Sequence, residues 1–255
     1  MYDRDPDPER EPGLVATGRL SARLLLPGET WVHRRVQQVS YFDSGLQQMR
    51  VSIDFTVPDG ELGTHLPVSV LPKWPPLYRL DFRAATGEPL PILTSKQNGI
   101  ADEQVLIALA ESVGAPLDKP AFRQAIRSLA RGPETDLYQP FGTFLEGLPD
   151  LTDPSQLRIA ELAALLTETT FLWYPIDDSA VAGQRTVCKV EYLIAAQESL
   201  GLSKRILRAL SLDQPPEYVH LWHAGADATF HVDIEAPKPL IVREAEPAYL
   251  ALIHR

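Results

Sequence analysis

The sequence predicts an α+β fold in which antiparallel, β-rich N- and C-terminal parts pack together around a central helical segment. Residues Met49–Val57 alternate apolar and polar side chains with a period of two, which is typical of a half-buried strand. Residues 98–170 carry apolar side chains at helical spacing, and residues 171–255 return to short β-type runs. Because strands and helices do not alternate regularly, a doubly wound parallel sheet is disfavoured.

The β-rich N-terminal part covers residues 14–97 and follows a charged, proline-containing stretch, 1–13, that predicts a disordered tail. A second strand is expected at Thr30–Phe42. The intervening Asp43-Ser44-Gly45 has turn chemistry, because glycine accepts positive φ and aspartate can bond its own backbone, so we predict a β-hairpin. Further short strands are expected at Pro67–Leu71, Leu77–Arg83 and Leu90–Thr94.

The helical part, 98–170, predicts three helices from their end signals. Asp102 is expected to cap the first, which Gly114 ends. Asp118 is expected to cap the second, with Pro120 in its first turn. The third is expected to start at Asp153-Pro154.

The C-terminal part, 171–255, predicts strands with one short helix between them. These three parts fit a single domain over 13–255 or two packed domains. The predicted strands are Phe171–Pro175, Thr186–Ala195, Val219–His223, Thr229–Glu235, Leu240–Arg243 and Tyr249–Ile253, and the helix is Ser203–Leu210.

The bulk composition excludes several classes of protein. The formal charge of −10 argues against a nucleic-acid binder, because phosphate contacts need a basic face. A single cysteine, Cys188, can form neither an internal disulfide nor a zinc-binding cysteine pair, which fits a reducing compartment. The chain has no apolar run of about 18 residues and no signal-peptide pattern at its start. We therefore expect an acidic, soluble, cytoplasmic protein.

One segment predicts a metal site. Gly225-Ala226 suits a two-residue hairpin turn, and pairing around it places His220 opposite His231 and Tyr218 opposite Asp233. Directly opposed residues have Cβ atoms about 5 Å apart. His220, His231 and Asp233 are then plausible zinc or iron ligands. The alternative is a solvated polar hairpin face that binds no ion.

For other residues with reactive, charged or aromatic side chains, the sequence favours structural roles. The sequence has neither the Gly-x-Ser-x-Gly motif of α/β-hydrolases nor the Gly-x-Gly-x-x-Gly motif of dinucleotide-binding proteins. Cys188, in an alternating strand, is expected to pack in the core rather than act as a nucleophile. Asp177-Asp178 is expected to form a turn, and Arg34-Arg35 a solvated strand face. Core or loop packing is favoured for Trp31, Trp74, Trp173 and Trp222 over a ligand cleft.

Five stretches carry a resemblance: Arg34–Val57, Pro67–Lys73, Tyr78–Arg83, Gly87–Thr94 and Phe230–Pro237. They resemble uncharacterised actinobacterial, hence bacterial, proteins of unknown function. The resemblance implies a soluble β module that apolar helices often follow. This chain ends at Arg255 without such helices, so it is expected to be either a piece of a longer protein or a member of a soluble branch. The resemblance implies no activity and transfers no functional residue.

The sequence is compatible with two functions. The first is a non-catalytic recognition or scaffold module, because strong catalytic motifs are absent and short strands have edges that can receive a protein partner or a second copy of the chain. The second is a metal-dependent hydrolase that uses His220, His231 and Asp233. No cofactor other than that divalent metal, no nucleic acid and no membrane are expected as ligands.

Overall fold

The computed structural model describes residues 12–26, 31–42, 46–59, 63–73, 76–131, 138–176, 182–195 and 229–235. The fold is α+β, as predicted, with strands in the N- and C-terminal parts around central helices. The elements in chain order are α1 (Pro12–Leu25), β1 (Val32–Tyr41), β2 (Leu46–Thr56), β3 (His65–Pro72), β4 (Tyr78–Ala84), α2 (Ser95–Ser112), α3 (Pro120–Arg131), α4 (Tyr138–Gly147), α5 (Pro154–Glu168), β5 (Thr169–Pro175), β6 (Arg185–Ala195) and β7 (Phe230–Glu235).

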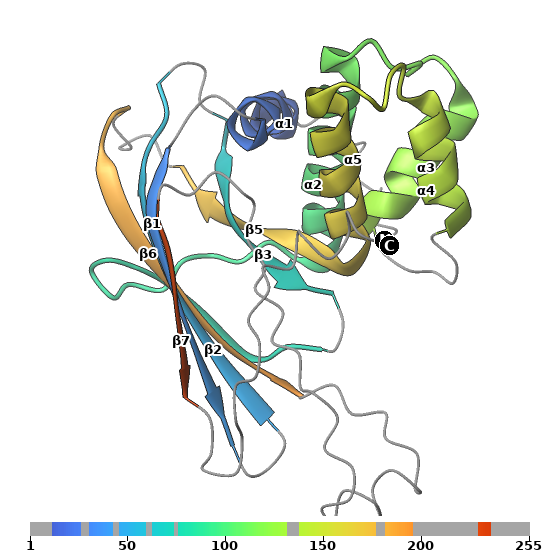
Figure 1. Cartoon of the computed structure of the whole chain (residues 1–255). Coiled ribbons are helices and arrows are strands. Elements are labelled where there is room, and N and C mark those ends of the chain that lie inside the picture. Colours follow the sequence, from blue (N-terminus) through green and yellow to red (C-terminus); the bar gives the residue numbers. More distant parts are fainter. Residues whose placement is uncertain are drawn as a thin grey trace, which may run out of the picture.

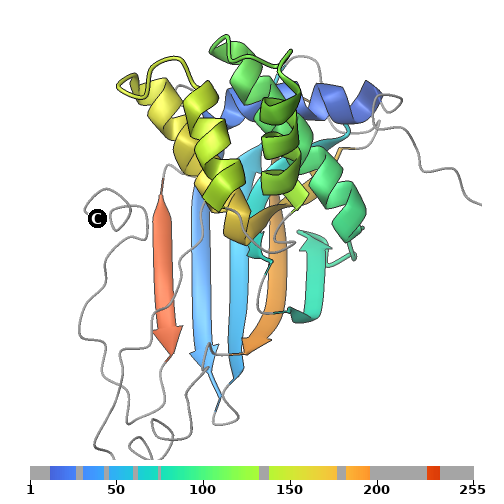
Figure 2. The ribbon, with the colours of Figure 1, turned by 90° about the vertical axis from the view of Figure 1, so that its right-hand side faces the viewer.

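Strands from both ends of the chain share one five-stranded sheet, in the order β4-β6-β2-β1-β7 (Figure 2). The predicted hairpin is confirmed, because β1 and β2 pair antiparallel. β2 also pairs antiparallel with β6, and β6 with β4. The sheet is not wholly antiparallel, since β7 runs parallel to β1 at one edge. The two β-rich parts therefore pack together by forming a common sheet.

The two faces of this sheet differ in character, as the period-two pattern of β2 predicts. Met49, Val51, Ile53 and Phe55 are buried and define an inner face, directed toward the helices. The intervening side chains of β2 and their neighbours on β6, such as Glu191, define the outer face. None of the described helices lies over the outer face (Figure 1).

A two-stranded ribbon, β3 paired antiparallel with β5, lies between the five-stranded sheet and the helices (Figure 1). Leu66 and Val68 of β3 belong to the apolar core beneath the sheet, whereas Val70, Phe171 and Trp173 belong to the helical core. Because both faces of the ribbon are covered, seven of the eight residues of β3 are buried. The ribbon thus joins the two cores.

α1 begins at Pro12, where the sequence predicted the end of a tail and the start of a β-rich part. Gly13 and Gly18 lower the helix propensity of this segment, which explains why its sequence pattern did not indicate a helix. Gly18 permits close packing on α2, because an added Cβ would lie 2.7 Å from the main-chain carbonyl of Gln104. Tertiary packing therefore outweighs the local preference.

α2 begins at Ser95, about two turns before the predicted cap, Asp102. Thr94 is the true N-cap: its hydroxyl accepts a hydrogen bond from the Gln97 N–H, and the Gln97 side chain accepts one from the Thr94 N–H. Asp102 is inside the helix and fully buried. The predicted strand Leu90–Thr94 is also wrong, because only an isolated bridge between Arg83 and Pro89 forms there.

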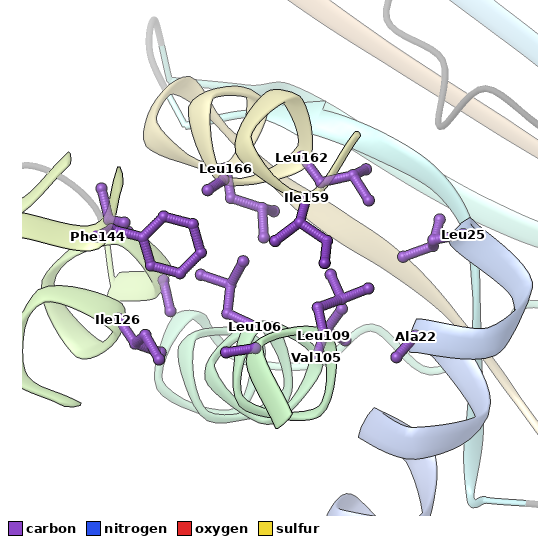
Figure 3. Close-up of a cluster of buried hydrophobic side chains, with 14 of the residues drawn as sticks. Ala22, Leu25, Val105, Leu106, Leu109, Ile126, Phe144, Ile159, Leu162 and Leu166 are labelled. Carbon is purple, nitrogen blue, oxygen red and sulfur yellow. The ribbon is translucent and has the colours of Figure 1, made fainter. Parts of the chain in front are cut away.

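The other two predicted helices are confirmed, and α4 was not predicted. Asp153 caps α5 through bonds from two main-chain N–H groups, with Pro154 in the first turn. α3 has Pro120 at its start. α4 contains Pro140 and Gly142, which obscure a helical pattern. Buried side chains from α1 to α5 form the helical core (Figure 3).

Several sequence predictions lie outside the described residues. They are the tail up to residue 11, the helix Ser203–Leu210 and the strands Val219–His223, Leu240–Arg243 and Tyr249–Ile253. Within the described residues, no helix is long and apolar enough to cross a membrane.

Candidate functional site

The predicted metal ligands are only partly placed by the structure. His231 and Asp233 are exposed on β7, where they pair with Val36 and Gln38 of β1. Being two residues apart on one strand, they point to the same face. His220 lies outside the described residues, so its pairing with His231 stays a prediction. Across the described ranges, no three His, Cys, Asp or Glu side chains are grouped as metal ligands would be.

Two of the other sequence hypotheses concern the sheet interior. Cys188 is fully buried, and burial raises the pKa of its thiol to about 12, so its predicted packing role is confirmed. The predicted solvated strand face is right for Arg34 and wrong for Arg35, which is 1% exposed. Arg35 donates to the Ser69 hydroxyl (2.9 Å) and the Val68 carbonyl (3.0 Å). These bonds to β3 offset the cost of burying the guanidinium between the sheet and the ribbon.

The tryptophans that the structure describes confirm core packing. Trp31 and Trp173 are 5% and 1% exposed. Trp74, Trp222 and the pair Asp177-Asp178 lie outside the described residues.

A buried polar cluster joins the ribbon to the helices. The Lys73 ammonium, just after β3, donates to the carbonyls of Leu129 (3.2 Å), Ala130 (2.9 Å) and Leu166 (2.6 Å). These carbonyls lie in the last turns of α3 and α5, where intrahelical donors run out. Burial lowers the pKa of Lys73 to about 8, and the nearby Asp102 carboxylate opposes that change.

Asp102 is the second member of this cluster. It accepts hydrogen bonds from the Thr170 hydroxyl (2.7 Å) and the Phe171 N–H (3.4 Å) of β5. Burial raises the pKa of Asp102 to about 7, against the opposing effect of these bonds and of Lys73. Because the cluster is enclosed and its bonds are internal, we assign it to holding the layers together rather than to ligand chemistry.

A groove on the outer face of the sheet is the best candidate for a functional site. Its volume is about 550 Å³, and part of its lining comes from the end of β1 and the start of β2. These strand ends lie away from the helices (Figure 2). The described residues that line it are Phe42, Leu46, Gln48, Tyr78, Arg79, Glu191 and Leu193.

Strand register places most of these side chains on one face. Glu191 and Leu193 are two apart on β6, and Gln48 of β2 pairs with Leu193. Phe42 follows β1 directly, and its N–H donates to the Leu46 carbonyl at 2.9 Å, which holds the ring beside the strand end. The period of two therefore brings these side chains together on the outer face.

A β-bulge in β4 brings the remaining two residues to the groove. Tyr78 pairs with Leu193 and Asp81 with Glu191, so Arg79 and Leu80 together oppose one residue of β6. In an unbroken strand Tyr78 would share the inner face with the buried Phe82, four residues on. The extra residue reverses that alternation and turns Tyr78 outward. It is Arg79, with φ of 53°, that takes the left-handed conformation.

Aromatic exposure and charge distinguish this groove. Phe42 and Tyr78 are 46% and 49% exposed. The Glu191 carboxylate is already bonded, since it accepts from the Arg50 guanidinium at 2.9 Å and from the Gln48 amide. Within the part of the chain that the structure describes, no hydrogen bond or ion pair engages Arg79. The groove thus combines two exposed rings with one unengaged guanidinium.

Sequence reasoning did not find this groove. Leu77–Arg83 was correctly expected to be extended, but nothing in its alternation indicates a bulge. Phe42 was taken only as the end of a strand.

Comparisons with protein-family models, with curated proteins and with solved structures find no match to this chain.

Proposed function

We propose that the protein is a non-catalytic recognition module that binds a large apolar side chain of a protein partner in the groove between Phe42 and Tyr78. The observation that carries the proposal is that two aromatic rings, each about half exposed, line one groove on an open sheet face. Aromatic side chains are enriched at protein interfaces relative to the rest of the surface. Aromatic residues also dominate the binding energy of protein interfaces.

The shape of the groove fits part of a polypeptide. Its volume of about 550 Å³ is within the ordinary range of ligand sites. Burial of one aromatic or long aliphatic side chain contributes roughly 1.5–3 kcal/mol to binding.

The chemistry of the lining supports binding rather than catalysis. The described lining residues include no serine, cysteine, threonine or histidine. A nucleophile with an adjacent imidazole base therefore cannot be assembled from them. The charged pair formed by Arg50 and Glu191 lies beside the rings and supplies the polar rim common in protein interfaces.

The test is selection from a displayed library of random heptapeptides, using the full chain as bait. Peptides that the protein enriches should share a large apolar residue. They should bind a Phe42→Ser/Tyr78→Ser double variant at least about tenfold more weakly, the loss expected for removal of two apolar contacts. Leu157→Ser is the matched control, because Leu157 is 46% exposed on α5, and it should bind like the parent protein. Enrichment of no peptides, or equal binding to the double variant, would refute the proposal.

A metal-dependent hydrolase that uses His220, His231 and Asp233 is the alternative function. The observation in its favour is that His231 and Asp233 are both exposed and share one face of β7. An imidazole and a carboxylate at this spacing supply two of the three ligands that a catalytic zinc site needs. Metal analysis of the purified protein tests it, as described below.

A further inference from the structure

We infer that the ligand of the groove carries a carboxylate next to its apolar side chain and that Arg79 binds this carboxylate. The inference rests on the proposed function, because it concerns the same groove. It adds the chemical class of the ligand, an acidic segment with an aromatic or long aliphatic residue, and the residue that selects it.

The first argument is the charge of the groove. Among the described residues that line it, two have ionised side chains, Arg79 and Glu191. The carboxylate of Glu191 already accepts from Arg50, 2.9 Å away, and from Gln48. The guanidinium of Arg79 has no such bond within the described residues, so the uncompensated charge in the groove is positive. In a chain of formal charge −10, this local sign selects an anionic ligand.

The second argument is the backbone of Arg79. A φ of 53° is a left-handed conformation that is unfavourable for a residue with a Cβ. Glycine is the residue usual at such a bulge position. Strain of this kind concentrates at binding sites, and here the strained residue is also, among the described residues that line the groove, the one whose charged group has no ion pair. The sequence thus places a guanidinium where glycine would be the more stable choice.

The third argument is the effect of the bulge on the strand. The same extra residue that strains the backbone also turns Tyr78 from the inner to the outer face. A single irregularity therefore delivers both an aromatic ring and a guanidinium to the groove. Guanidinium and carboxylate form paired, charge-assisted hydrogen bonds, which gives a directional contact beside a non-directional apolar one.

The experiment compares two probes that differ only in charge: N-acetylphenylalanine, with a free carboxylate, and N-acetylphenylalaninamide. Binding to the full chain is followed by ¹H–¹⁵N correlation spectra at millimolar probe concentrations. The carboxylate probe should bind about fivefold more tightly than the amide, the ratio expected for one charge-assisted bond at a solvent-exposed site. Signals from Phe42, Tyr78 and Arg79 should shift.

Three variants complete the experiment. In Arg79→Gln the ratio between the probes should fall to about one, whereas Arg19→Gln, which removes an exposed arginine on α1, should leave it unchanged. In Arg79→Gly the ratio between the two probes should also fall to about one. This variant should unfold at no lower a temperature than the parent protein, because glycine relieves the backbone strain. That result separates loss of the contact from loss of the fold.

The outcomes distinguish this inference from the proposed function. If both probes bind the parent protein equally well and shift the groove signals, the carboxylate inference is wrong and apolar recognition stands. If neither probe shifts those signals, both are wrong. If the ratio survives in Arg79→Gln, another group binds the carboxylate and the role of Arg79 is refuted.

Discussion

Replacing Lys73 by methionine is expected to weaken the joint between the ribbon and the helices. The substitution keeps most of the side-chain volume but removes the ammonium that bonds three carbonyls of α3 and α5. Each buried carbonyl left without a donor costs about 1–3 kcal/mol. Relief from burying the ammonium offsets part of that sum. Asp102 also loses the nearby cation that favours its ionised form.

The expected net loss in the free energy of unfolding is about 3–5 kcal/mol, the usual cost of removing one partner from a buried charged cluster. Equilibrium unfolding in urea, monitored by tryptophan fluorescence and circular dichroism, measures it. Lys119→Met provides the control, because Lys119 is exposed before α3, and its stability should change by less than about 0.5 kcal/mol. A loss below about 1 kcal/mol in Lys73→Met would mean that these three bonds do not hold the layers together.

Three further predictions concern Asp102, Gly18 and His231. Burial raises the pKa of Asp102 from 3.8 to about 7, so the folded protein keeps a proton that the unfolded chain releases. The free energy of unfolding should therefore fall as pH rises from about 4 to 7, and urea titrations of Asp102→Asn should lack that decline. Gly18→Ala should lower the free energy of unfolding by about 1–3 kcal/mol, because the new Cβ would overlap the Gln104 backbone. The melting temperature should therefore fall although alanine has the better helix propensity. A higher melting temperature would contradict the tight α1–α2 packing. For the hydrolase alternative, plasma mass spectrometry should find about one equivalent of zinc, iron or manganese in the parent protein and none in His231→Ala, and metal-free parent protein would end that alternative.

Several elements could be predicted because their determinants are local in sequence. The alternation in Met49–Val57 depends only on which side chains point to opposite faces of a strand, and β2 has that burial pattern. Asp153 and Pro154 mark the start of α5 through groups within one helical turn. The α+β class followed from such local signals.

Other elements depended on contacts that the sequence does not display. Gly13 and Gly18 weaken the helical pattern in the sequence of α1, and close packing on α2 stabilises this helix. The carboxyl of Asp102 looks like a helix cap, but Thr94 caps the helix and Asp102 bonds β5 instead. Arg35 was expected in solvent and is buried, because β3 supplies a hydroxyl and a carbonyl for its guanidinium.

The candidate groove belongs to the second group. The fold class, the β1–β2 hairpin and two helices follow from the sequence, because turn residues, caps and periodicity act within a few residues. The face of β4 that carries Tyr78 depends on the fold, since one bulged residue opposite β6 reverses the alternation. The fold also sets the charge pairing: Arg50 is bonded to Glu191, whereas the Arg79 guanidinium has no ion pair within the described residues. Strand register and charge pairing join residues far apart in the chain, and their energies exist only once those residues meet.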